Sequence, residues 1–496
     1  MTEEMRVRPD EVPQWTLTEL ANELDSTTNA EGTVTGISLH SKHVVPGDLY
    51  AALPGASSHG AAFAGVAKAR GAVGVLTDPE GAALVTELPE IIVDDARGAI
   101  AKLSSFIYGD PSSSFTTIGV TGTQGKTTTT YLAEAALGEH KSAVVGTIGT
   151  RIGKMPAPSS LTTPEAPQLQ ALFAVMREEA IEVCAMEVSS HALVQGRVDG
   201  FVFDVAVFLN LGRDHLDFHK DLEDYFLAKA ALFTPQHSKH AVINIDDAHG
   251  KRLAELTPLP VTTFSTDGNQ ADWRAVNIRP HRLGTDLEVL GPNGVEVPLS
   301  VPLPGVFNVS NALAVIASLA QAGFDPAELA AGIATSTGVP GRMERIDAGQ
   351  PFTAIVDYAH KPDAVTAVLD ALRPVTAGRL IIVIGAGGDR DHGKRPLMGE
   401  AAAKHADVVI VTDDNPRKEN AAAIRADVMS GAGNGPGLAI EVAGRREAIA
   451  QAVAMAHLGD TVVIAGKGHE RGQEIRGKIH PFDDREVLIE LIESAE

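Results

Sequence analysis

The sequence has little cysteine and no long apolar run. Its one cysteine, Cys184, excludes an intrachain disulfide, and its place in the apolar run 182–186 predicts a buried core thiol rather than a nucleophile. No stretch approaches the roughly 18 apolar residues of a membrane helix, and the first residues lack the apolar segment of a signal peptide. We therefore expect a cytoplasmic protein without a membrane span.

Basic and aromatic residues are also scarce. The chain has 41 Lys and Arg against 64 Asp and Glu, a net charge of −23, and no basic block. A nucleic-acid binder normally presents a basic face, so no nucleic-acid partner is expected. Aromatics make up 4% of the residues, which favours tight helix–sheet packing over stacking platforms. Anionic small substrates remain possible, because a few local cations and bound Mg²⁺ can reverse the field inside a cleft.

The length of 496 residues predicts about three domains. In the first 110 residues, short apolar runs at 48–53 and 74–77 flank a helical stretch at 61–70, which is typical of a small α/β unit. Turn-rich joints follow at 109–114 and 337–341. We therefore expect domains at 1–112, 113–338 and 339–496.

The middle and last segments both have the pattern of parallel α/β sheets. The middle one has short apolar runs, a β-rich insertion and then a helix; these lie at 117–120, 183–188, 205–209, 241–245, 261–304 and 309–321. The last one has apolar runs that end in Gly, Asp or Thr, with helical segments between them, at 354–357, 380–384, 408–411 and 461–465. The predicted fold class is α/β, with a central P-loop sheet and a C-terminal doubly wound, Rossmann-like domain.

A glycine-rich turn between a strand and a helix gives the strongest single motif. Its residues are Gly122, Thr123, Gln124, Gly125, Lys126, Thr127 and Thr128. Backbone N–H groups of such a loop and the helix N-terminus can cradle phosphates, Lys126 can reach the β- and γ-phosphates, and Thr127 can bind Mg²⁺. Val120 stands where the usual pattern has its first Gly, so the motif is the shorter GxxGKT.

Two further groups allow more than one interpretation. Glu187 follows a predicted strand, where a carboxylate is either a Mg²⁺ ligand or simply solvated. His215, Asp217 and His219 form an HxDxH pattern that fits either a transition-metal hydrolase or a hard-metal site with one imidazole. No further clustered Cys or His set completes a zinc sphere, although His237 and His240 lie nearby in sequence.

Taken together, the motifs resemble those of the Mur ligases, in that family's order and over about residues 35 to 485. They are GTQGKTT (122–128), LTTPE (161–165), MEVSSHAL (186–193), NLGRDHLDFH (210–219), FNVSNALA (307–314), GRMER (341–345) and DYAHKPD (357–363). Within the family, the chain looks like the members that add the third amino acid to UDP-MurNAc-L-Ala-D-Glu during peptidoglycan synthesis. The resemblance implies a monomer that phosphorylates a carboxylate with ATP and lets an amine attack the acyl-phosphate.

The resemblance also assigns catalytic and nucleotide-binding roles. It implies two Mg²⁺ ions and catalytic roles for Lys126, Glu187, His215 and Lys229, with Thr127, Glu187, His215 and Lys229 as metal ligands. Lys229 would be carbamylated by CO₂, although an isolated lysine there would be interpreted as a surface helix residue. Asn308, Asn311, Arg342 and Asp357 would join residues 122–128 in binding ATP, and Asn311 could equally be a helix cap.

The remaining implied contacts belong to the other two substrates. UDP-MurNAc-L-Ala-D-Glu would contact Leu39, Ser41, Ser57, Ser58, Thr162, Thr163, Ser189, Gln195 and Arg197. His40 stands where relatives often have Asp, so the uridine side of this assignment is the least supported. The amino acid would contact Arg390, Asp414, Asn415, Pro416, Arg417, Gly466 and Glu470.

The resemblance implies that Arg417 selects the amino acid. The run 414–417 reads DNPR, which matches family members that add meso-diaminopimelate, whereas lysine-adding members typically lack this Arg. Diaminopimelate has a distal carboxylate that lysine lacks, and a guanidinium can bind it in a bidentate manner. The structural alternative is a turn residue after Asn-Pro that makes a local salt bridge.

Three functional classes follow from these residues. An amide-forming Mur or folylpolyglutamate-type ligase comes first, then a P-loop hydrolase or kinase, then a nucleotide-binding regulator without chemistry. Glu187, His215 and Lys229 argue against the regulator, and the DNPR and GKGHE (466–470) motifs of the last domain argue against the hydrolase.

Overall fold

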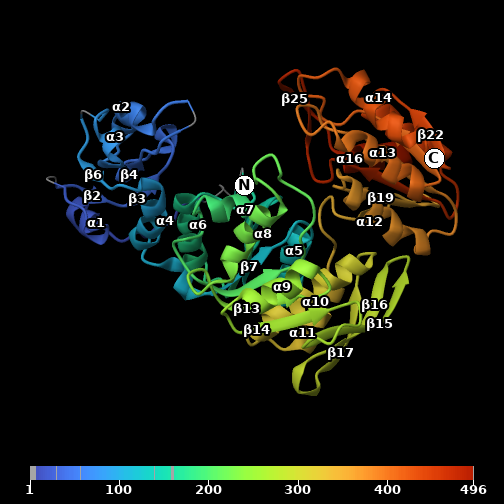
Figure 1. Ribbon diagram of the computed structural model, residues 1–496, viewed down its shortest axis with the longest axis horizontal. Coiled ribbons are helices and arrows are strands. Elements are labelled where there is room, and N and C mark those ends of the chain that lie inside the picture. The colour runs from blue at the N-terminus through green and yellow to red at the C-terminus, as the bar shows by residue number, and fades with distance from the viewer. Residues whose placement is uncertain are drawn as a thin grey trace. The chain divides into compact units, whose positions relative to one another are not determined.

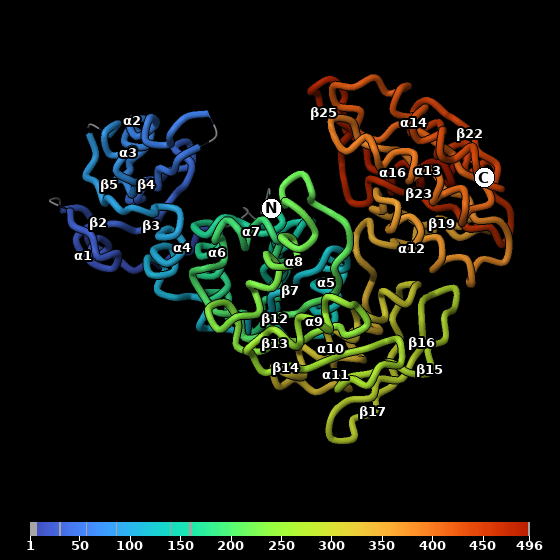
Figure 2. Tube along the Cα trace, viewed as in Figure 1, coloured from blue at the N-terminus to red at the C-terminus, as the bar shows by residue number. Residues whose placement is uncertain are grey.

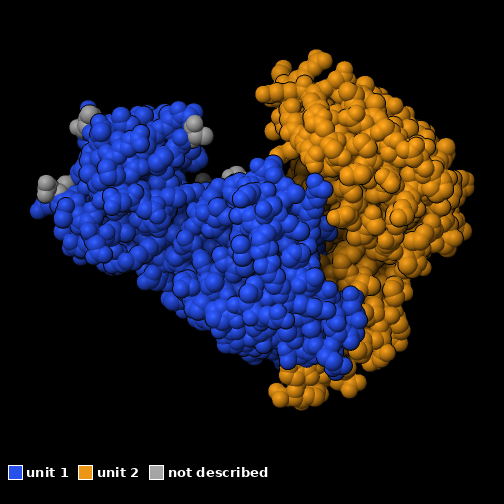
Figure 3. Space-filling view, viewed as in Figure 1, with its two compact units in different colours: residues 1–274, 313–329 blue, residues 275–312, 330–496 orange. Residues whose placement is uncertain are grey.

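The computed structural model describes residues 7–28, 31–55, 57–85, 87–138, 140–157 and 161–494. The chain divides into two compact units, 1–274 with 313–329 and 275–312 with 330–496 (Figure 3). Figure 2 follows the chain through an N-terminal sheet (blue), a central sheet and a C-terminal sheet (orange to red). No helix within the described ranges combines the length and apolarity needed to cross a bilayer.

The N-terminal part is built on a parallel sheet of order β3-β4-β5-β6 (Figure 1). An apolar core lies on each face of this sheet. Its elements are β1 (Trp15–Thr16), α1 (Leu17–Glu23), β2 (Thr33–Val34), β3 (Gly36–Ser38), β4 (Asp48–Ala51), α2 (Ala64–Ala69), β5 (Gly74–Thr77), α3 (Pro79–Ala82), β6 (Glu90–Ile92) and α4 (Ala96–Ile107). The helix predicted at 61–70 is a 3₁₀ turn at Gly60–Phe63 followed by α2, because Phe63 leaves helical geometry with φ −102° and ψ 9°.

The central sheet has the strand order β10-β9-β8-β11-β7-β12-β13-β14-β15-β16-β17. Its strands are β7 (Thr116–Thr121), β8 (Ser142–Gly146), β9 (Gly149–Ile152), β10 (Met155–Ala157), β11 (Val183–Glu187), β12 (Phe203–Phe208), β13 (Ser238–Asn244), β14 (Val261–Ser265), β15 (Trp273–His281), β16 (Gly284–Leu290) and β17 (Glu296–Val301). The helices are α5 (Lys126–Leu137), α6 (Ala166–Glu178), α7 (Ser190–Val194), α8 (Leu222–Ala230), α9 (Ala248–Leu256), α10 (Val306–Gln321) and α11 (Pro326–Ala334).

Parallel pairing sets the position of the site in this sheet. β7 lies between β11 and β12 and runs parallel to both, with Val120 opposite Glu187 on one side and Val207 on the other. The carboxyl ends of parallel strands meet at one edge of a sheet, where α/β proteins bind ligands. The loops after β7, β11 and β12 therefore begin side by side.

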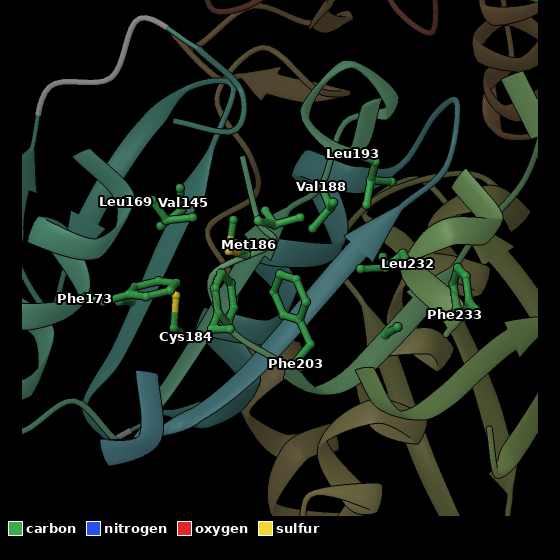
Figure 4. Close-up of a cluster of buried hydrophobic side chains, with 14 of the residues drawn as sticks. Val145, Leu169, Phe173, Cys184, Met186, Val188, Leu193, Phe203, Leu232 and Phe233 are labelled. Carbon is green, nitrogen blue, oxygen red and sulfur yellow. The ribbon is translucent and has the colours of Figure 1, made fainter. Parts of the chain in front are cut away.

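Side chains of β8, β11 and β12 build an apolar core beside this edge. Val145, Cys184, Met186 and Phe203 lie in one buried cluster with α6 side chains such as Phe173 (Figure 4). Cys184 is fully buried, and burial raises the pKa of its thiol to about 12, so the predicted core thiol is confirmed.

The C-terminal sheet has the order β18-β19-β23-β20-β21-β22, parallel except for the edge strand β18. The elements of this part are β18 (Glu344–Ile346), β19 (Thr353–Asp357), α12 (Pro362–Leu372), β20 (Leu380–Ile384), α13 (Lys394–His405), β21 (Val408–Val411), α14 (Ala421–Ala432), β22 (Leu438–Glu441), α15 (Arg445–Met455), β23 (Thr461–Ala465), β24 (Gly472–Ile475), β25 (Lys478–Pro481) and α16 (Asp484–Glu493). One sheet face packs against α15 and α16. The predicted α/β class, with a P-loop sheet and a doubly wound C-terminal sheet, is confirmed, and the exact domain boundaries stay a prediction.

Candidate active site

The predicted phosphate loop lies between β7 and α5. Gly125 precedes the helix with φ 89°, a left-handed conformation that glycine adopts without steric cost. No side chain caps α5 within the described residues, so the N–H groups of its first turn and the positive end of its dipole suit an anion. The sequence placed this loop correctly between a strand and a helix.

Asn210 fixes the shape of this loop, a role that the sequence analysis missed. Its Oδ1 accepts from the backbone N–H groups of Thr123 (3.1 Å) and Gln124 (3.0 Å), and its Nδ2 donates to the Gln124 carbonyl (3.2 Å). The Asn210 carbonyl also accepts from the Thr123 N–H at 3.0 Å. The available signal was its position two residues after β12, at the start of the 210–219 motif.

Two lysines meet at one carbonyl of the loop. Lys126 Nζ donates to Gly122 O at 2.7 Å, and Lys229 Nζ donates to the same oxygen at 3.0 Å. Lys229 also donates to Thr121 Oγ1 at 3.4 Å, lies 4.6 Å from the centroid of the Tyr225 ring, and is only 1% exposed. Lys229 is therefore a buried residue of the loop's wall, and not the surface helix lysine of the alternative interpretation.

Glu187 lies at the end of β11 and is equally buried, at 1% exposure. Its carboxylate accepts from the Thr147 N–H (2.8 Å) and hydroxyl (3.1 Å). A Cβ on Gly146 would lie 2.3 Å from Glu187 Oε1, so this approach requires glycine. The alternative of a solvated strand-end carboxylate is wrong.

The HxDxH segment does not form the three-ligand metal site of the hydrolase interpretation. His219 is buried, with Nε2 2.9 Å from Ser190 Oγ and Nδ1 3.1 Å from Asp224. Ser190, His219 and Asp224 are therefore linked in the order of a nucleophilic Ser-His-Asp triad. Ser190 is only 1% exposed, however, and has no access to a substrate. His215, with φ 52° and its Nε2 3.1 Å from Asp214, is instead half-exposed.

The donors around the loop fit a hard cation better than zinc. No group of three or more His, Cys, Asp or Glu in the described ranges has metal-binding geometry. Thr127 and Glu187 supply oxygen donors, which Mg²⁺ prefers, and Mg²⁺ usually keeps several waters and borrows phosphate oxygens from its substrate. The oxygen donors present therefore fit Mg²⁺ brought with a nucleotide better than zinc.

The predicted muramoyl-peptide residues form a hydrogen-bonded group beside Glu187. Thr163 Oγ1 donates to the Glu187 carbonyl at 2.8 Å and accepts from the Ser189 N–H at 3.1 Å. Arg197 donates to the Thr163 carbonyl at 2.9 Å and to Gln195 Oε1 at 2.5 Å.

Two predicted members of the peptide-binding set have other notable partners. Thr162 Oγ1 lies 3.0 Å from Thr147 Oγ1, the hydroxyl that donates to Glu187. Arg197 forms an ion pair with Glu165 at 2.9 Å. The predicted set therefore connects to the Glu187 carboxylate through hydroxyls and backbone.

The predicted uridine residues lie in the N-terminal sheet's loops. Ser41 is buried at the start of a 3₁₀ turn, and Leu39 is half-buried just before it. Ser57 and Ser58 are exposed on the loop after β4.

Residues predicted to reach the nucleotide from later in the chain are held by local contacts. Asn308 Nδ2 donates to the Pro304 carbonyl at 2.8 Å, and Asn311 Nδ2 donates to Asn308 Oδ1 at 3.3 Å. Asp357 accepts from the Met343 (2.8 Å) and Ala359 (2.7 Å) N–H groups, and burial raises the pKa of its carboxyl. The guanidinium of Arg342 stacks 4.3 Å from the centroid of the Tyr358 ring.

The predicted amino-acid residues converge at the carboxyl ends of β21 and β23. Asn415 Nδ2 donates to Glu470 Oε2 at 2.9 Å. Lys467, fully buried and missed by the sequence analysis, donates to both Asn415 Oδ1 (3.1 Å) and Glu470 Oε2 (2.9 Å).

The other predicted residues of this group lie around that pair. A Cβ on Gly466, which has φ 114°, would lie 2.8 Å from Asp414. Pro416 is buried, Arg417 is partly buried, and Arg390 is exposed on the neighbouring loop.

Replacing Asn210 by Ala should weaken nucleotide binding by at least about tenfold, because its side chain makes three hydrogen bonds to the loop backbone, each worth about 1 kcal/mol. Titration with a fluorescent ATP analogue measures this. Asn277→Ala, which removes an exposed amide bonded to Glu288, is the matched control. Unchanged nucleotide affinity in a folded Asn210→Ala protein would contradict the assigned role.

Three family descriptions match successive parts of the chain. They are "Mur ligase family, catalytic domain" at residues 33–107, "Mur ligase middle domain" at 120–319, and "Mur ligase, glutamate ligase domain" at 341–468. The three matches follow the order of the three predicted domains.

Individual relatives match over nearly the whole chain. A Streptomyces avermitilis protein named UDP-N-acetylmuramoyl-L-alanyl-D-glutamate–2,6-diaminopimelate ligase is 53% identical, over 99% of this chain and 98% of its own. A Corynebacterium glutamicum protein of the same name is 50% identical over 92% of each chain. A solved structure of an enzyme with that name is 37% identical, with a TM-score of 0.69 over 93% of this chain and 95% of its own. The chain therefore belongs to the Mur ligase family, and its fold is that family's three-domain α/β fold.

Proposed function

We propose that this chain is an ATP-dependent ligase that joins meso-2,6-diaminopimelate to the D-glutamate carboxylate of UDP-MurNAc-L-Ala-D-Glu in peptidoglycan synthesis. The observation that carries the proposal is that the loop bearing Arg417 also holds Glu470, through its Asn415, so that one loop supplies a guanidinium and orients a carboxylate for a diamino acid. The names of relatives at 50% identity and above support the same substrate pair.

The chemistry requires activation because a carboxylate is a poor electrophile. Transfer of the γ-phosphate of ATP to the D-glutamate carboxylate gives an acyl-phosphate and ADP. The neutral amine of diaminopimelate then attacks the carbonyl carbon, phosphate leaves, and the amide nitrogen loses a proton. The protein's task is to align the groups and to neutralise the charge spread over the phosphoryl oxygens.

The loop after β7 performs the first part of that task. The N-terminus of α5 and its first N–H groups hold the phosphates, while Asn210 keeps the Thr123 and Gln124 amides in place. Lys126, which donates to Gly122 O in this structure, would turn to the β- and γ-phosphates when ATP binds.

Thr127, Glu187 and His215 would hold Mg²⁺, as would a modified Lys229. Bound Mg²⁺ neutralises phosphate charge and orients the γ-phosphate. Glu187 suits this role because its carboxylate is already oriented by Thr147. We infer a cell-wall enzyme that takes ATP, two Mg²⁺ ions and small-molecule substrates in the cytoplasm, acting as a monomer.

Lys229 fits a metal site only after carbamylation. An ammonium carries three donors and no acceptor, so it cannot ligate a cation. Addition of CO₂ to the neutral amine with loss of a proton gives a carbamate, whose oxygens are anionic ligands. The buried position of Lys229 beside Gly122, within the phosphate loop, supports this proposal.

The remaining residues would divide among the other ligands. Asn308, Asn311, Arg342 and Asp357 would complete the ATP site. Leu39, Ser41, Ser57 and Ser58 would contact the uridine, while Thr162, Thr163, Ser189, Gln195 and Arg197 would contact the muramoyl-peptide; the links of Thr162 and Thr163 to Glu187 support the second set.

The amino-acid pocket would bind the charged groups at both ends of diaminopimelate. Glu470 would hold the distal ammonium, Arg417 the distal carboxylate and Arg390 the other carboxylate, with Asp414, Asn415, Pro416 and Gly466 shaping the pocket. A site built to pair a substrate carboxylate disfavours an analogue without one, because the analogue does not form that charge-assisted pair.

Lys229→Ala should reduce turnover by at least about a hundredfold, because a mutation in a metal ligand or its support typically costs 10–100-fold or more. Short-chain carboxylic acids should restore part of the activity by supplying the missing carboxylate. Phosphate release from ATP measures both effects. Lys251→Ala, on the exposed side of α9, is the control. Wild-type activity in Lys229→Ala, or no rescue at any acid concentration, would refute the carbamate.

Arg417→Ala should raise the KM for diaminopimelate by about tenfold or more while leaving the KM for ATP nearly unchanged, because charge-assisted bonds contribute about 1.5–3 kcal/mol. A panel of meso-diaminopimelate, L-lysine and L-ornithine should show that discrimination against lysine falls. Arg446→Ala, which removes an exposed Arg paired with Glu490, is the matched control. Equal changes in both KM values would count against the assignment.

A further inference from the structure

The short strand β24 is hydrogen-bonded along its length to the loop that holds Arg417. Gln473 Nε2 donates to the Asp414 carbonyl at 2.6 Å, and the Glu474 N–H donates to Asn415 Oδ1 at 3.0 Å. The Arg417 N–H then donates to the Glu474 carbonyl at 3.0 Å. Both the N–H and the carbonyl of Glu474 are therefore hydrogen-bonded, which fixes its backbone beside Arg417.

This arrangement places the Glu474 carboxylate on the Arg417 guanidinium. Arg417 Nε lies 3.3 Å from Glu474 Oε2, and Arg417 Nη1 donates to the Gly388 carbonyl at 2.6 Å. Arg417 has φ 49°, a left-handed conformation that is costly for a long side chain and that its backbone bonds to Glu474 and Arg476 help to hold. The guanidinium proposed to bind a substrate carboxylate thus already holds a carboxylate of the chain itself.

We propose that Glu474 is an internal counter-ion of Arg417 that competes with the distal carboxylate of the amino acid and so sets the degree of selectivity. The inference rests on the proposed function of Arg417. When diaminopimelate binds, its carboxylate replaces that of Glu474. When lysine binds, Arg417 keeps Glu474 and is not left unpaired, so the penalty for lysine is smaller than it would otherwise be.

The Arg417–Glu474 pair differs from the neighbouring Lys467–Glu470 pair in solvent exposure. The Glu474 side chain is 39% exposed, so its carboxylate can turn into water when it is displaced. Lys467, which pairs with Glu470 in the same pocket, is fully buried and has no such alternative. Lys467 is therefore a fixed support of Glu470, whereas Glu474 is a replaceable partner of Arg417.

Glu474→Gln tests the proposal because it removes the charge and keeps the main-chain bonds that fix β24. A partly exposed ion pair contributes up to about 1 kcal/mol, so the variant should lower the KM for meso-diaminopimelate by about two- to fivefold. The ratio of kcat/KM for diaminopimelate to that for L-lysine should rise by at least as much. Glu400→Gln, an exposed Glu on α13 of the same unit, is the control for charge alone.

The same substitution in the Arg417→Ala background completes the test. With Arg417 absent, Glu474→Gln should leave the diaminopimelate-to-lysine ratio unchanged. A rise in KM for both amino acids, or an equal effect in both backgrounds, would overturn the proposal and make Glu474 a direct ligand or a structural residue. If wild-type ATP turnover were indifferent to diaminopimelate, the proposed function itself would fail, an outcome distinct from these.

Discussion

The site depends on the parallel pairing of β7 with β11 and β12. Because Val120 lies opposite both Glu187 and Val207, the phosphate loop, the buried carboxylate and Asn210 all follow their strands at the same level. A slip of one residue would turn the side chains of a strand to the opposite face. The apolar core under these strands holds that register, so the chemistry at the edge depends on side chains that never touch a substrate (Figure 4).

Local sequence predicted much of this arrangement. The inner parallel strands β7, β11, β12, β13, β19, β20, β21 and β23, the loop at Gly122 and the burial of Cys184 each follow from a short pattern and agree with the structure, whereas β8, β9, β10, β18 and β22 were not predicted. Asn210 and Lys467 could not be assigned in this way, because the loop residues that they bind, Gln124 and Asn415, lie 86 and 52 residues away in the chain. The same limit applies to Arg417: its sequence context suggested a ligand contact or a local salt bridge, whereas the salt bridge in the structure joins it to Glu474, on a strand much later in the chain.

The phosphate loop and the amino-acid pocket use charge differently. At the phosphate loop, neutral backbone and amide groups fix the loop conformation, and two lysines donate to one backbone carbonyl. In the C-terminal pocket, charges are already paired within the chain, as in Lys467 with Glu470. Such pairs add little to stability but leave the groups oriented, so a diamino acid meets a site whose polar geometry is largely formed.

The central claim is that ATP cleavage here serves the formation of one amide bond. The most direct measurement is phosphate release from ATP with UDP-MurNAc-L-Ala-D-Glu and meso-diaminopimelate added singly and together, alongside detection of the product. The account predicts sustained release only with both substrates, with one amide formed for each phosphate. Sustained release that is independent of the muramoyl-dipeptide, or that occurs without amide formation, would contradict it.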